Sequence, residues 1–162
     1  MSLTRESYVT RSVEKYLHDR LTSHGYTSDV IELLDSFPHE GIESPLKKTF
    51  IAAGFNFDDD GKQAELGSNL KRRVYTIEFF VFGQTAVWAS NVANAVKFSL
   101  ENDQIVPIFD VADPAMPQID AMPVIGVMAH HQPIPAPKPW QEHVWTVLLK
   151  AEDTYVPSEA VS

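Results

Sequence analysis

The alternation of side chains between residues 70 and 82 constrains the fold of this chain more than any other feature. Every second position there carries a large apolar side chain, namely Tyr75, Ile77, Phe79 and Val81. A period of two is the period of a β-strand, whose successive side chains point to opposite faces of a sheet. The positions between them are also mostly apolar, so we expect a strand that is largely covered on both faces.

Two further segments have the period of a helix. Residues 4–24 place apolar side chains three and four positions apart, with Thr4 as the expected N-cap and Gly25 just beyond the last turn. A second helix is expected from Thr85 to about residue 101. Its predicted buried stripe includes Trp88, Val92 and Val96, together with other small or apolar residues.

The remaining apolar runs predict strands at residues 30–37, 48–57, 106–112, 122–131 and 140–155, and the prolines at 133–139 predict an extended segment. The order is one helix, two or three strands, one helix and three strands. We therefore expect an α+β fold with two layers, in which a mostly antiparallel sheet is covered by two helices. Residues 1–156 are expected to form a single domain, followed by a C-terminal tail at 157–162.

Composition excludes several classes of function. The chain has 162 residues and no cysteine, which excludes disulfides, thiolate zinc sites and cysteine nucleophiles. Its net charge of −9 opposes binding to a phosphate backbone, and the one dense basic run is Lys71, Arg72 and Arg73. We expect neither specific nucleic-acid binding nor a membrane span.

A polar segment between two predicted strands is the candidate assembly loop. Residues 58–69 are expected to form a long exposed hairpin loop that carries Asp58, Asp59, Asp60, Lys62 and Glu65. Its start imitates a calcium-binding loop, but the position of the closing glutamate is occupied by Gly67. A solvated acidic loop is the favoured interpretation, and weak binding of divalent cations stays open.

The search for catalytic chemistry predicts no catalytic, cofactor-binding or metal-binding residues. His130 and His131 are neighbours, so in a strand they point to opposite faces and cannot both bind one ion without a bend. The sequence has no nucleophile elbow of the G-x-S-x-G type. One alternative stays open, a small metal-dependent enzyme that uses His130, His143 and the acids at 58–60.

Two segments carry a resemblance to a known family. The strand at 72–83 is followed at once by the helix that contains Trp88, and the sequence WQEHVWTV begins at Trp140. This arrangement resembles the tail terminator proteins of long-tailed bacteriophages. The resemblance implies an α+β virion protein that forms a hexameric ring, caps the tail tube and joins it to the head-side connector, with DNA passing through the ring.

The same resemblance implies the partners and the location of the chain. The expected partners are other copies of the chain, the major tail tube protein and the head-tail connector protein, and no catalytic residues are implied. Assembly would take place in the host cytoplasm, and the final location would be the tail or neck of the virion. Another ring of the neck, such as a head-completion or connector protein, is the alternative within this class.

Overall fold

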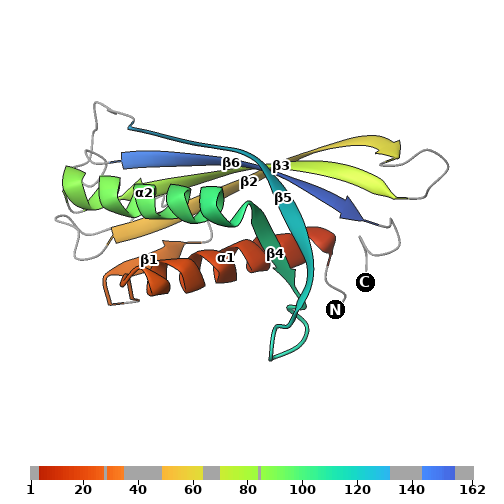
Figure 1. Ribbon diagram of the computed structural model, residues 1–162, viewed down its shortest axis with the longest axis horizontal. Coiled ribbons are helices and arrows are strands. Elements are labelled where there is room, and N and C mark those ends of the chain that lie inside the picture. The colour runs from red at the N-terminus through yellow and green to blue at the C-terminus, as the bar shows by residue number, and fades with distance from the viewer. Residues whose placement is uncertain are drawn as a thin grey trace.

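The computed structural model describes residues 4–27, 29–34, 49–63, 70–83, 85–131 and 144–155, without the side chains of residues 34 and 58–63. The described part contains helices α1 (Arg5–Ser23) and α2 (Ala86–Asp103) (Figure 1). Its strands are β1 (Ile31–Leu34), β2 (Thr49–Gln63), β3 (Lys71–Phe82), β4 (Ile105–Phe109), β5 (Gln118–His131) and β6 (Val144–Tyr155).

The strands form one sheet in the order β1-β2-β3-β6-β5-β4. The pair β1 and β2 is parallel, and the other four pairs are antiparallel. Both helices lie on the same side of the sheet (Figure 1). The predicted α+β class, with a mostly antiparallel sheet and two helices, is therefore confirmed.

Strand β3 lies at the centre of the sheet, between β2 and β6. Tyr75, Ile77, Phe79 and Val81 are at most 1% exposed and face the helices. The expectation that both faces are covered is wrong for the middle of the strand, where Glu78 on the other face is exposed. The helices pack against one face alone, and the opposite face is buried only near the end of β3.

Helix α1 begins and ends where the sequence predicts. The side chain of Thr4 accepts a hydrogen bond from the backbone N–H of Ser7, and Gly25 follows the helix with a φ of 90°. That left-handed conformation carries no steric penalty for glycine. The apolar stripe of α1, which includes Val9, Val13 and Leu17, is buried.

Helix α2 also begins at its predicted cap, Thr85, but the expected burial of Trp88 is wrong. Trp88 is 37% exposed, whereas Ala89 is fully buried. A Cβ atom added to Gly83 would lie 2.6 Å from the backbone nitrogen of Ala89, so β3 and α2 approach each other at this point. The close approach turns Ala89 into the core and leaves Trp88 at its margin, where the indole contacts the ring of Tyr26 edge-on.

Strand β5 changes partners along its length. It pairs with β4 up to Pro123 and with β6 from Val124 onward, with a register shift between Val124 and Gly126. Strand β4 packs against α1, and the later part of β5 packs against α2, so β5 bends strongly along its length (Figure 1). This bend, at the point where β5 changes partner, curls the sheet.

Several strands have boundaries that differ from the predicted ones. The strand predicted at 30–37 is described only over Ile31–Leu34, the strand at 48–57 continues to Gln63, and the strand at 122–131 begins at Gln118. The proline segment at 133–139, His143 and the tail at 157–162 lie outside the described residues. Neither of the two described helices is long and apolar enough to cross a membrane.

Candidate assembly surface

The predicted assembly loop is largely part of a strand. Asp58, Asp59, Asp60 and Lys62 belong to β2, so the interpretation of a free loop beginning at residue 58 is wrong. Glu65 lies outside the described residues. Polar residues can continue a strand wherever a partner strand supplies the hydrogen bonds. The hydrophobic pattern alone therefore predicted an end of the strand that is too early.

The acidic segment and the basic run face each other across one hairpin. Asp59 is in register with Arg73, and Gln63 is in register with Lys71, with a register shift between the two pairs. Opposite charges at facing positions stabilise an antiparallel pair. Within the same chain, β3 places a basic position opposite Asp59, whereas Asp58 is opposite Val74.

The base of this hairpin is anchored by Arg73. Its guanidinium lies 4.2 Å from the ring centre of Phe57 and 4.9 Å from that of Tyr155. The guanidinium also donates a hydrogen bond of 3.2 Å to the hydroxyl of Tyr155. Arg73 is buried, and these contacts replace part of the hydration that its guanidinium loses, so the arm formed by β2 and β3 has an anchored base (Figure 1).

The structure brings together two segments that lack charge. In a chain with 22% charged residues, no Asp, Glu, Lys or Arg occurs at 79–96 or at 121–137. The first segment runs from β3 into α2, and the second contains most of β5. They meet beside residues 144–149 of β6, which are also uncharged. We call the exposed side chains of residues 85–96, 121–131 and 144–149 the neutral surface.

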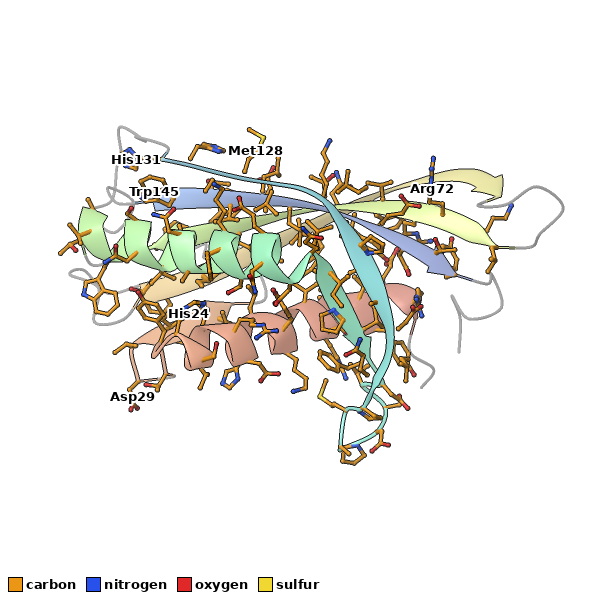
Figure 2. The ribbon with its side chains drawn as sticks, in the orientation of Figure 1. His24, Asp29, Arg72, Met128, His131 and Trp145 are labelled. Atoms are coloured by element: carbon orange, nitrogen blue, oxygen red, sulfur yellow. The ribbon has the colours of Figure 1, made fainter. Side chains whose placement is uncertain are left out.

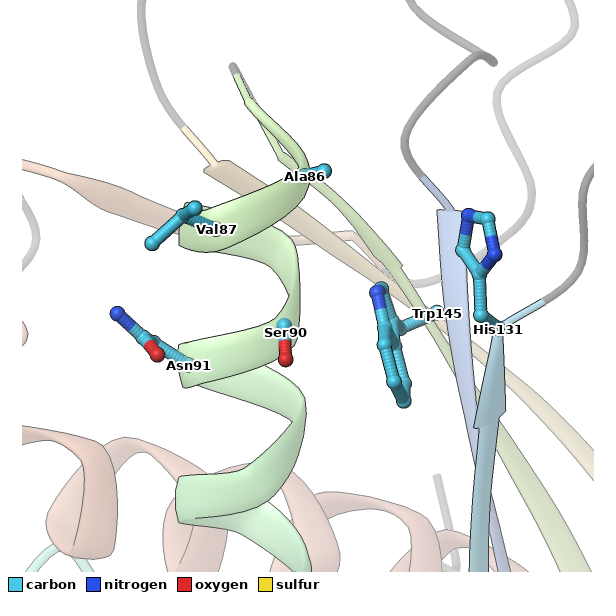
Figure 3. Close-up of a pocket in the computed structure, with 6 residues that line it drawn as sticks. All are labelled: Ala86, Val87, Ser90, Asn91, His131 and Trp145. Atoms are coloured by element: carbon cyan, nitrogen blue, oxygen red, sulfur yellow. The ribbon is translucent and has the colours of Figure 1, made fainter.

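A hollow lies where the two segments meet. Its volume is about 320 Å³, and it is lined by Ala86, Val87, Ser90, Asn91, His131 and Trp145 (Figure 3). The rings of His131 and Trp145 lie 5.6 Å apart, with an angle of 41° between their planes. Figure 3 shows these two rings on one side of the hollow and the first turns of α2 on the other.

The neutral surface also contains large apolar side chains in contact with solvent. Val87 is 68% exposed, Met128 is 62% exposed and Ile125 is 54% exposed. Figure 2 shows Met128 directed away from the body of the molecule. Depletion of charge, together with Met and aromatic side chains, is the composition of the core of a protein interface.

The edge of β5 adds to this surface. Beyond Pro123, β5 has β6 on one side, and no strand of the described ranges pairs with its other side. Exposed edges are usually protected by charged side chains or by further prolines. Residues 125–131 contain neither, so this edge has the properties of a surface that meets another protein.

The histidines predicted to point apart are found on this edge. His130 is in register with Thr146 of β6. Asp58 is in register with Val74 of β3, which is itself in register with Glu152 of β6. Six positions along β6 separate these points, which corresponds to about 20 Å. That separation is too large for His130 and the acids of β2 to bind one ion, and among the described residues no three potential ligands come together.

The neutral surface was not predicted from the sequence, because its mark there is the absence of charged residues and not the presence of a functional group. Trp145 contributes to the hollow only because α2 and β5 are brought beside it. The signal that was available is the length of the two uncharged segments in an acidic chain. No protein-family model matches the chain, and a search of curated protein sequences finds no significant match.

Proposed function

We propose that this chain is a structural subunit of the tail of a long-tailed bacteriophage, the tail terminator, and that it is not an enzyme. The observation that carries the proposal is the neutral surface, in which Val87 is exposed at the hollow and Ile125 and Met128 are exposed on β5. A soluble monomer rarely leaves large apolar patches in water. Burial of this surface between copies of the chain explains an uncharged region on a protein whose net charge is −9.

The assembled form is a closed ring, a hexamer, that caps the tail tube and joins it to the head-side connector. A ring requires two different patches on each copy, so that each subunit contacts the next in the same way. The DNA passes through the channel, and an acidic protein with few basic groups does not retain it by its phosphates. This assignment rests on the sequence resemblance together with the composition of the neutral surface.

Electron microscopy of mixtures tests the function. Purified chain is mixed with tail tubes of the phage that encodes it, and with the head-side connector separately. Rings seated at tube ends are the expected result. Binding to the connector with no binding to tubes would favour another neck ring, and a particle that binds neither contradicts the proposal.

The arm of β2 and β3 is proposed as the element that joins the ring to its neighbour. Removal of residues 58–69 is a poor test, because it deletes paired positions of β2. Substitution of Asp58, Asp59 and Asp60 by asparagine keeps the strand and removes the charge. We expect rings to form normally and to bind tube ends less often than a control with Asp29→Asn and Glu32→Gln. Equal binding by both variants would leave the arm without a role in joining.

A further inference from the structure

The turn between β4 and β5 is an ordered projection. It extends away from the helices and the sheet (Figure 1), and backbone hydrogen bonds close it, from Asp110 to Pro117 at 2.8 Å and from Met116 to Asp113 at 2.9 Å. The carboxylates of Asp110 and Asp113 accept further hydrogen bonds, from the backbone N–H groups of Ala112 and Ala115. The turn is therefore fixed before any partner binds.

The base of the projection is fixed to the core. The backbone N–H of Phe109 donates a hydrogen bond of 2.8 Å to the hydroxyl of Ser12, and Ser12 is fully buried in α1. Lys15 lies over the ring of Phe109 at 5.0 Å. A rigid base means that the end of the turn keeps its position relative to the rest of the subunit.

The end of the turn is apolar. Pro114, Ala115 and Pro117 are exposed, and Met116 is half-buried. Met116 has a φ of 45°, which is rare for a residue other than glycine, asparagine or aspartate. Backbone strain of this kind persists where the surrounding structure imposes it, and it is concentrated at sites of function.

We propose that the end of this turn, residues 113–117, inserts into the hollow of the neutral surface on the next copy of the chain. This inference rests on the proposed function, because it assigns one contact of the proposed ring. The occupant of the hollow is a second copy, and the contact joins the β4–β5 turn of one subunit to α2, β5 and β6 of its neighbour.

Shape and apolar chemistry support the contact. A hollow of about 320 Å³ is roughly twice the size of a cavity that holds one benzene molecule, roughly 150 Å³. It therefore has room for the side chain of Met116 and a proline ring. The thioether of methionine makes favourable contacts with aromatic rings, and Trp145 and His131 present such rings to the hollow (Figure 3).

Charge is also complementary. The first turn of α2 forms one side of the hollow and contains no acidic residue. The start of a helix carries partial positive charge, which favours a carboxylate nearby. Asp113 flanks the apolar end of the projecting turn and supplies such a carboxylate. Electrostatic attraction therefore favours this turn as the occupant of the hollow over a segment with a positive charge.

The placement of the two partners determines the kind of assembly. The hollow lies at the start of α2 and the turn lies at the far ends of β4 and β5 (Figure 1). Each copy therefore uses one patch toward one neighbour and the other patch toward the next. A head-to-tail contact of this kind repeats from copy to copy, and it gives the proposed ring when the rotation between neighbouring copies closes.

Introduced cysteines test the contact directly, because the chain has none of its own. Ser90→Cys places a thiol in the hollow, and Ala115→Cys places one on the turn. With a short bismaleimide, a mixture of the two single variants should give dimers. The double variant should give a ladder of multimers up to the closed ring. A control pair of Ala115→Cys and Asn102→Cys, at the other end of α2, should give neither.

The outcomes separate this contact from the proposed function. Rings that form without any crosslink overturn the contact and leave the ring proposal standing. A ladder that stops at the dimer overturns the head-to-tail arrangement. A chain that stays monomeric alone and with tail tubes overturns both.

A second variant removes the apolar group without disturbing the backbone. Met116→Asn keeps a residue that tolerates positive φ and removes the thioether. We expect an unchanged melting temperature and a loss of the crosslinked ladder. Gln104→Asn, at the left-handed position that ends α2, is the matched control and should crosslink like the parent. A full ladder from Met116→Asn would overturn the role of this side chain.

Discussion

Arg5 and Asp153 lie 148 positions apart in the sequence and form a buried ion pair. The Nε and Nη2 atoms of Arg5 donate to the two carboxylate oxygens of Asp153 at 2.9 and 2.8 Å. The two side chains are 7% and 1% exposed. Arg5 also contacts Asp120 of β5 at 3.0 Å, so one guanidinium joins the start of α1 to two strands.

Loss of one partner should destabilise the fold strongly. Asp153→Ala leaves the guanidinium of Arg5 buried without its main counter-charge, and we expect a loss of about 3–5 kcal/mol in the free energy of unfolding. Denaturant titration measures this. The exposed pair of Lys15 and Asp19 is the control, because Asp19→Ala should cost no more than about 0.5 kcal/mol. Similar losses in the two variants would contradict the account of the buried pair.

Gly83 should tolerate no side chain. A Cβ atom there would lie 2.6 Å from the backbone nitrogen of Ala89 and 2.8 Å from its Cα, so α2 would have to move away from β3. We expect Gly83→Ala to lower the melting temperature markedly. At Gly54 the nearest atom is 3.9 Å away, on the ring of Phe80, and Gly54→Ala should leave the melting temperature nearly unchanged. Equal melting temperatures of Gly83→Ala and Gly54→Ala would indicate that the start of α2 lies further from β3 than described.

Tyr16 should make stability sensitive to alkaline pH. Burial raises the pKa of Tyr16, and so does its hydrogen bond of 2.7 Å to Asp103. The folded chain therefore holds this proton more tightly than the unfolded chain, whose tyrosine pKa is about 10. The stabilisation is complete below that pH and is lost as the pH rises above it.

The test compares unfolding at pH 8 and at about pH 10.5. We expect the parent to lose more stability over this interval than Tyr16→Phe does. Burial raises the pKa of Tyr75 as well, so the variant should reduce the dependence without abolishing it. Tyr8→Phe, which removes a hydroxyl from the same helix, is the control. An unchanged dependence in Tyr16→Phe would show that the hydroxyl is solvated.

Trp88 should contribute less to stability than a core aromatic residue. Phe79 is fully buried in β3, and Trp88 is 37% exposed. We expect Phe79→Ala to cost about 3–5 kcal/mol and Trp88→Ala to cost clearly less, because Trp88 keeps only part of its surface away from water. Thermal unfolding of both variants measures the two losses. A loss for Trp88→Ala as large as that for Phe79→Ala would indicate the deeper burial of Trp88 that the helical pattern predicted.

The sequence predicted the fold wherever a strong local pattern coincided with burial. The alternation from Tyr75 to Val81 and the caps Thr4 and Thr85 identified β3 and both helices correctly. Trp88 was misplaced because its burial depends on how closely Gly83 lets α2 approach β3. That distance is a tertiary property which helical spacing does not contain.

The candidate site was less predictable for the same kind of reason. The acidic run was recognised, but the position of Asp59 opposite Arg73 depends on a register that these polar residues do not themselves specify. The hollow is built from α2, β5 and β6, whose contact arises only from the topology of the sheet. The sequence does show that residues 79–96 and 121–137 carry no charged side chains.

The central claim is that the neutral surface is buried between copies of this chain in a closed ring. The most direct test is mass photometry of the purified chain over a range of concentrations, alone and with tail tubes. Six copies of an 18.2 kDa chain give a particle of about 109 kDa, and a population at that mass is the predicted result. A mass of one chain at every concentration, with and without tubes, would contradict the account.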